Sequence, residues 1–174
     1  MFSSILCPVD FSDLSALALR RAIAMAGESR AHLTLLHVTD PLLDAAARAA
    51  GTEDTIASQT QDELKALLHA VSPDGVKASM TVEVAVGDPA QEIVRQAFTC
   101  GADLIVMGTH GRRGLSRALM GSDAEMVVRE ARVPVLLVRS PERPAAHSRR
   151  SKERTAGPAV RSGGNSHKAA RPAS

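Results

Sequence analysis

A glycine-rich segment between residues 108 and 122 could bind the phosphate groups of a ligand. It reads GTHGRRGLSRALMGS, with glycines at 108, 111, 114 and 121 and with Ser122 at its end. Glycines let the backbone approach a bulky anion closely, and a helix that begins near Ser122 would offer it unsatisfied N–H groups. Arg112, Arg113 and Arg117 add positive charge. The segment is not a P-loop, since no Gly-Lys-Ser/Thr ends it, and its glycines are not spaced like a dinucleotide fingerprint.

Several of these residues also have purely structural interpretations. Ser122 and Glu125 have the spacing of a capping box, which satisfies the first N–H groups of a helix without any ligand. The glycines before Ser122 favour the phosphate interpretation over this one. The arginines could form only a solvated face, and His110 could be a solvated loop residue.

Strands and helices alternate along the first 139 residues. Apolar or alternating runs predict five strands, at residues 3–9, 32–38, 80–86, 103–108 and 133–139. Cap residues and apolar periodicity predict four helices: from Ser12 to about Gly27, from Thr52 or Thr55 to Val71, from Asp88 to about Cys100, and from Ser122 to Ala131. Residues 40–51 are predicted to be a loop with a helical turn. The alternation predicts an α/β fold, with a single doubly wound five-stranded parallel sheet flanked by helices.

This topology predicts where a ligand would bind. Ligands of doubly wound sheets bind beyond the carboxyl ends of the strands, where the winding reverses. The first and fourth strands of a five-stranded sheet of this kind usually lie side by side at that point. Asp10, which follows the first strand, should therefore face the same crevice as the glycine-rich segment. Asp10 could instead cap the first helix or close a turn.

Composition excludes several classes of function. The chain has 174 residues, of which 44% are hydrophobic, but only 2% are aromatic, with three Phe and neither Trp nor Tyr. A surface that stacks bases on aromatic rings is therefore not expected. No apolar run approaches the roughly 20 residues of a membrane span, and no basic region precedes the first apolar run as in a secretory signal. Cys7 and Cys100 lack metal-ligand spacing and are interpreted as buried thiols in a reducing compartment.

Charge and composition change after residue 139. Residues 1–139 contain 13 basic and 17 acidic residues, whereas residues 140–174 contain 8 basic and 2 acidic residues. The second segment is rich in Pro, Ser, Gly and Arg, and it has too little apolar surface to offset its ordering entropy. We expect a nucleotide-binding domain at 1–139 and a disordered basic tail at 140–174. Binding of nucleic acid through the tail is the less favoured interpretation, because solvated basic tails are common.

The spacing Gly108-x2-Gly111-x9-Gly121-Ser122 resembles the ATP-binding signature of the universal stress protein family. The similarity extends over about residues 1–139, including ILCPVD, LTLLHV, GDPAQEIVRQA and GADLIVMGTHGRRGLSRALMGSDAEMVVREARVPVLLV. The resemblance implies a five-stranded α/β fold, a homodimer and bound ATP, often with a divalent metal such as Mg or Mn on its phosphates. It implies a nucleotide site formed by Pro8, Val9, Asp10, Val38, Met107, Gly108, His110, Gly111, Arg112, Gly121 and Ser122.

One residue departs from the family pattern. Asp123 follows the Gly-Ser pair at a position that is usually small or apolar in ATP-binding relatives. A carboxylate suits the helix dipole there, but it competes with phosphates for the same positive end. This should weaken triphosphate binding and leave adenosine recognition unaffected.

These observations predict a cytoplasmic adenine-nucleotide-binding protein of stress response or signalling. No catalytic constellation and no protein metal site are recognised, so any ATP hydrolysis should be slow. Two alternatives stay open: a slow ATPase or adenine-nucleotide hydrolase that uses the same pocket, and a dimeric interaction module without nucleotide that acts through its basic tail. The apolar last strand, residues 133–139, is expected to form the homodimer, and further protein partners are not identified. No membrane association is expected.

Overall fold

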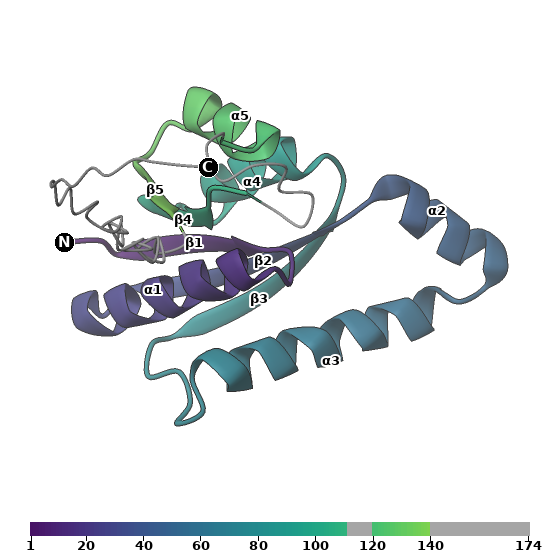
Figure 1. The fold of residues 1–174 in the computed structure, drawn as a ribbon, viewed down its shortest axis with the longest axis horizontal. Helices are drawn as coiled ribbons and strands as arrows, with labels where there is room; N and C mark the ends of the chain where they lie inside the picture. The colour runs from purple at the N-terminus through teal and green to yellow at the C-terminus, as the bar shows by residue number, and fades with distance from the viewer. Residues whose placement is uncertain (111–119, 140–174) are drawn as a thin grey trace, which may run out of the picture. The chain divides into compact units, whose positions relative to one another are not determined.

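The chain forms a five-stranded parallel sheet with helices on both faces, as the sequence predicts (Figure 1). The computed structural model describes residues 1–110 and 120–139. The strands follow the order β3-β2-β1-β4-β5. Their bounds are Ser4–Val9 for β1, His32–Thr39 for β2, Met80–Val86 for β3, Leu104–Gly108 for β4 and Val135–Val138 for β5. The helices are α1 at Asp13–Ser29, α2 at Pro41–Ala50, α3 at Glu53–Val71, α4 at Pro89–Thr99 and α5 at Ser122–Glu130.

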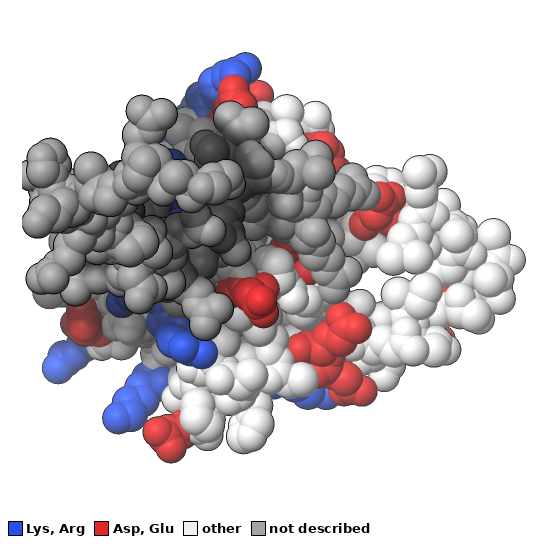
Figure 2. Space-filling view, viewed as in Figure 1, with Lys and Arg blue, Asp and Glu red and all other residues white. Residues whose placement is uncertain are grey.

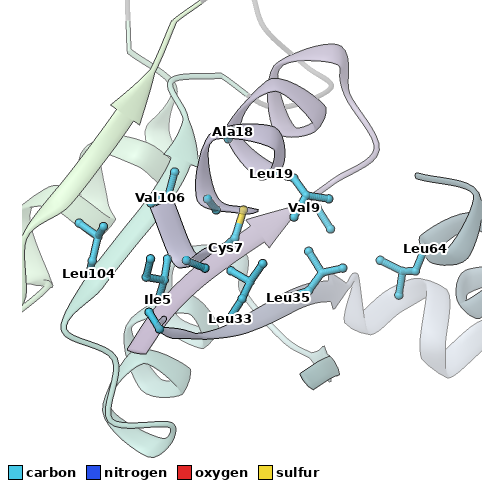
Figure 3. Packing of buried hydrophobic residues seen from close by; sticks show 13 residues of the cluster. Ile5, Cys7, Val9, Ala18, Leu19, Leu33, Leu35, Leu64, Leu104 and Val106 are labelled. Carbon is cyan, nitrogen blue, oxygen red and sulfur yellow. The ribbon is translucent and has the colours of Figure 1, made fainter. Parts of the chain in front are cut away.

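Two buried clusters hold the layers together. Alternate residues of the central strands point to opposite faces of the sheet, so Ile5, Cys7 and Val9 pack under α1, while Leu6 packs under α4 and α5. Figure 3 shows the first cluster, in which Leu64 of α3 points toward the strands. Burial raises the pKa of the Cys7 thiol, which therefore stays protonated and inert as a core residue.

The predicted starts of two helices are confirmed. The Ser12 hydroxyl accepts a hydrogen bond from the Ser15 N–H at 3.2 Å, which caps α1. The Asp88 carboxylate accepts one from the Gln91 N–H at 3.0 Å, with Pro89 in the first turn of α4. Both caps satisfy N–H groups that a helix leaves without an internal partner. These local interactions fix where each helix leaves the edge of the sheet.

The expectation of a loop at residues 40–51 is wrong, because this segment forms the complete helix α2. Asp40 caps it by accepting from the Leu42 N–H at 2.7 Å, Pro41 occupies the first turn, and Gly51 ends it with a φ of 64°. This Asp-Pro start and glycine end are the same signals that identified α4. The helix packs loosely on the rest of the described residues, since only Ala47 on it is buried.

The α2–α3 pair has few buried contacts to the rest of the described residues. Leu64 is the one buried residue of α3, and a hollow of about 170 Å³ lies between this pair and the valines Val84 and Val86 of β3. Residues 40–86 carry eight acidic and three basic residues, and Figure 2 shows acidic side chains gathered over α2 and α3. The excess negative charge of the folded part is therefore concentrated in this segment.

Within residues 1–110 and 120–139, no helix is both long and apolar enough to cross a membrane.

Candidate functional site

The topology brings the carboxyl ends of β1 and β4 together. β1 pairs with β2 on one side and with β4 on the other, with Ile5 opposite Leu104 and Leu6 opposite Ile105. The chain winds from β1 toward β3 on one side and from β4 to β5 on the other, so the winding reverses between β1 and β4. This is the switch point at which ligands of such sheets bind. The predicted adjacency of the first and fourth strands is confirmed.

The turn after β1 is built by Asp10, Phe11 and Ser12. The Asp10 carboxylate accepts from the Ser12 hydroxyl at 2.6 Å and from the Ser12 N–H at 3.1 Å. Phe11 between them has a φ of 64°, a left-handed backbone that is uncommon outside glycine. Asp10 therefore has the turn-closing role that the sequence left open, at the edge where the ligand is expected. Such strained positions cluster at functional sites.

His37 is a residue at this edge that the sequence analysis did not select. It lies opposite Val9 in the register, and its Nδ1 is 3.0 Å from the Val9 carbonyl oxygen. Because a carbonyl can only accept, Nδ1 carries the proton and Nε2 keeps its lone pair in the neutral ring. The ring centroid is 4.7 Å from that of Phe11. In the sequence, only its position near the end of the second strand could have indicated that it lies at this edge.

Pro8, Val9 and Val38 lie at the same edge. Pro8 is buried opposite Leu36, and β1 continues one residue past it to Val9, which is 5% exposed. Val38 is half-buried near the end of β2 and packs against the cluster under α4 and α5. Of these three side chains, only that of Val38 is partly exposed at this edge.

The end of β4 is closely packed against the start of α1. Met107 is buried, and a Cβ added at Gly108 would come within 3.3 Å of the Leu14 Cβ. A side chain at this position would crowd the start of α1, so glycine favours the close approach of α1 to this strand. After it, the Thr109 N–H donates to the Val138 carbonyl oxygen at 3.0 Å, which ties the end of β4 to β5.

His110 has one buried nitrogen without a hydrogen bond. Its Nδ1 is 3.0 Å from the Thr109 hydroxyl, whereas Nε2 is buried and has no hydrogen-bond partner among the described residues. A buried polar atom without a partner costs free energy, of the order of 1–3 kcal/mol. The position beside the glycine-rich segment makes this nitrogen a candidate ligand contact.

The alternative interpretation of Ser122, as the capping residue of its helix, is not realised in the described residues. Gly121 is the N-cap residue of α5, with φ −67° and ψ 152°, and no side chain of the described residues forms a cap hydrogen bond with this helix. The Ser122 hydroxyl instead donates to the Asp123 carboxylate at 3.3 Å. The Gly121 N–H donates to the Thr109 carbonyl oxygen at 2.8 Å, so the start of α5 lies beside the end of β4. The first turn of α5 therefore begins at the switch-point edge without the predicted capping box.

The two remaining predicted site residues, Gly111 and Arg112, lie outside the described residues, as do Arg113 and Arg117. Among the described residues, no group of three or more His, Cys, Asp or Glu side chains could hold a metal ion. The described edge thus brings together Pro8, Val9, Asp10, Val38, Met107, Gly108, His110, Gly121 and Ser122 from four segments of the chain.

Comparison with known proteins gives a consistent result. The family model described as "Universal stress protein family" matches residues 1–139. A universal stress protein of Methanocaldococcus jannaschii, MJ0531, is 37% identical over 147 residues, which is 82% of this chain and 85% of that protein. The structure of universal stress protein UspA from Lactobacillus plantarum is 29% identical, covers 79% of this chain and 97% of its own, and has a TM-score of 0.66.

Two of the similar solved structures are described with a bound nucleotide, and one of them is more than 25% identical to this chain. It is a universal stress protein in complex with cAMP, 26% identical, covering 80% of this chain and 98% of its own, with a TM-score of 0.56. The match of the family model over residues 1–139, the identity to MJ0531 and the order of the sheet all agree. This chain therefore belongs to the universal stress protein family.

Proposed function

We propose that this protein binds an adenine nucleotide, with ATP as its ligand, at the edge where β1 and β4 end, and acts in stress response or signalling. The observation that carries the proposal is the start of α5. This helix begins at Ser122 with no side-chain cap, and Gly121 is held against the end of β4. Such a start offers N–H groups and a partial positive charge to a phosphate.

In this proposal the described residues have the following roles. Val9, Val38 and Met107 would contact adenine and ribose, and Asp10 would face the ribose. Gly121 and Ser122 would contact phosphates through their backbone, and His110 Nε2 supplies a further polar atom with no partner in the described residues. A similar structure with cAMP bound supports an adenine nucleotide as the ligand class.

A divalent cation would be held mainly by the phosphates of the ligand. The described residues contain no cluster of three or more candidate metal ligands, and phosphate oxygens are favoured ligands of Mg²⁺. The protein would then contribute the positive end of α5 and the backbone around Gly121. A dedicated catalytic role is not part of this proposal.

The first test uses the unusual absorbance of the chain. Because the protein has neither Trp nor Tyr, a peak at 260 nm in the purified protein would report bound nucleotide almost directly. Chromatography of the supernatant after denaturation would identify the nucleotide and distinguish it from nucleic acid. Calorimetric titration with ATP, ADP, cAMP and adenosine, with Mg²⁺ or Mn²⁺ present, then ranks the ligands.

The result that contradicts the proposal is equally direct. If the purified protein carries no nucleotide and binds none of the four ligands at millimolar concentration, the edge between β1 and β4 is only a structural connection. Phosphate release from ATP, measured in the same samples, would decide whether the bound nucleotide is hydrolysed.

A further inference from the structure

A second hollow lies between the carboxyl ends of α4 and α5, away from the nucleotide edge. It measures about 640 Å³ and is lined largely by apolar side chains, among them Val94, Ala97, Ala131 and Val133. Val94 and Ala97 lie in α4, which leads into β4, and Ala131 and Val133 lie between α5 and β5. The hollow therefore lies near the amino ends of these two strands. The proposed nucleotide site is at the opposite, carboxyl ends.

Phe98 stands at the rim of this hollow. It lines the hollow and is nevertheless 84% exposed, in a chain with only three Phe residues. A large exposed aromatic side chain beside an apolar depression is typical of an anchor at a protein interface. Its exposure in the isolated chain leaves apolar surface in water that a docked partner would cover.

The rim of the hollow carries one acidic and one basic side chain that are not paired with other described residues. Glu130 and Arg132 both line the hollow, and neither forms an ion pair with another side chain of the described part. Arg95, the other cation there, is already paired with Glu92 on its own helix. A charged small molecule would satisfy one of the two remaining charges and oppose the other. A surface that carries one of each sign is instead complementary to itself.

We propose that this hollow is a self-association surface, occupied by a second copy of the chain related by a twofold axis. Phe98 of each copy would enter the hollow of the other, and Glu130 of each would face Arg132 of the partner copy. In a twofold contact every pairing occurs twice. Phe98 and the hollow that receives it must therefore lie on the same face of the molecule, and so must Glu130 and Arg132. This condition is met here. The hollow adjoins the amino end of β5 and shares Val133 with the segment 133–139 that is expected to form its own contact, but it does not include Val135–Val138 of β5 itself.

The test is sedimentation of the full chain over a wide concentration range. Phe98→Asp should weaken the association by at least about tenfold, because it places a carboxylate in an apolar hollow. Val82→Asp is the matched control, since Val82 is also exposed and apolar but lies on the opposite edge strand β3. Circular dichroism would verify that both variants are folded. The same pair is measured in a Leu136→Lys background, which removes any contribution from the last strand.

Charge exchange tests the twofold arrangement itself. Glu130→Arg or Arg132→Glu alone would place like charges opposite each other and weaken the association. The double variant, and an equimolar mixture of the two single variants, should restore it, because opposite charges then meet again.

Two results would overturn the proposal. One is a wild-type chain that sediments like Phe98→Asp at every concentration in both backgrounds. The other is a failure of both the double variant and the mixture to recover association.

Discussion

At the scale of single residues, the space around Gly121 limits how closely a ligand could approach the start of α5. Gly121 has an ordinary φ of −67°, so any residue could adopt its backbone. An added Cβ would lie 3.3 Å from the Thr109 carbonyl oxygen, which accepts the Gly121 N–H. Glycine at this position therefore avoids crowding of the Thr109 carbonyl oxygen, and it does not relieve backbone strain. The same space is where the proposed phosphates would approach the first turn of α5.

We predict that Gly121→Val lowers the affinity for ATP by at least about tenfold, or about 1.4 kcal/mol, in a protein that stays folded. The branched side chain would occupy the space that the phosphates need. Calorimetry measures the affinity, and thermal unfolding measures the stability beside it. Gly27→Val is the control, since nothing lies within 4 Å of a Cβ added there. An unchanged affinity would argue against phosphate contact at this position.

Asp123 provides the opposite test. Asp123→Asn removes a negative charge from the first turn of α5, and it should tighten ATP more than adenosine, which has no phosphate. The loss of a favourable helix-dipole interaction should cost about 0.3–1 kcal/mol of stability. Glu125→Gln controls for the general loss of charge, because Glu125 is paired with Arg129. Equal changes in the affinities for ATP and adenosine would show that Asp123 does not lie near the phosphates.

At the scale of elements, two interactions determine how segments are attached to the sheet. Leu64 is 2% exposed and attaches α3 to the cluster of β1 and β2 (Figure 3). Asp103 attaches the start of β4 to the start of β1. Its carboxylate accepts from the Ser3 N–H at 2.8 Å, the Ser3 hydroxyl at 2.7 Å and the Ser4 N–H at 3.1 Å. Each interaction bridges parts of the chain that are distant in sequence.

Leu64→Ala should destabilise the protein by about 2–3 kcal/mol, because it removes the main buried side chain of α3 and leaves a cavity. Hydrogen exchange should accelerate in α2 and α3 more than in β1 or β4, since few other buried residues hold this pair. Leu42→Ala is the control: Leu42 is 80% exposed, and its loss should cost less than about 0.5 kcal/mol. Uniform acceleration over the whole sheet would show that α3 unfolds only together with the rest.

Asp103 predicts a pH dependence of stability. Partial desolvation raises the pKa of its carboxyl, but the hydrogen bonds from Ser3 and Ser4 outweigh this and lower the pKa below its ordinary value. A lowered pKa in the folded state means that the stabilisation is complete above the ordinary aspartate pKa of about 3.9. It is lost as the pH falls below that value and through the pKa of the folded chain.

The measurement compares the free energy of unfolding of wild type and Asp103→Asn at neutral pH and at about pH 3. Wild type should be more stable at neutral pH, and the difference should shrink in acid. A difference that is independent of pH would show that the charge of Asp103 contributes nothing.

At the scale of the whole molecule, the unpaired edges of the sheet favour association. β5 pairs only with β4 among the described strands, and Leu136 on it is 39% exposed. An edge strand with apolar residues can pair with a second chain. In a twofold dimer, β5 of one copy would pair with β5 of the other, so that neither β5 strand is left as an exposed edge. The last strand and the hollow with Phe98 would then be two independent contacts between copies.

We predict a homodimer through β5, measured by light scattering. Leu136→Lys should weaken it by at least about tenfold, because a charged side chain on an edge strand opposes pairing. Val82→Lys on the other edge strand, β3, is the control and should leave the dimer unchanged. A wild-type chain that is monomeric at high micromolar concentration would contradict this prediction.

The sequence alone determined the succession of strands and helices along the chain and most helix bounds, because these depend on local signals. Apolar runs predicted all five strands, and Ser12 and Asp88 predicted the starts of α1 and α4. The proximity of the first and fourth strands also followed, since the winding of such sheets has few alternatives. The family was recognisable from the spacing of Gly108, Gly121 and Ser122. Helix α2 carried the right end signals, with Asp40 and Pro41 at its start and Gly51 at its end, although only Ala47 on it is buried.

Only the tertiary structure decided the contacts between distant segments. His37 donates to the Val9 carbonyl oxygen across 28 residues, Asp103 accepts from Ser3 across 100, and Gly121 donates to Thr109. The sequence gives no sign of such pairs, because register and packing depend on the folded sheet. The same holds for Ser122, where the capping box was locally plausible. Gly121 takes the cap position instead, where its N–H is held by the end of β4, and no side chain of the described residues caps α5.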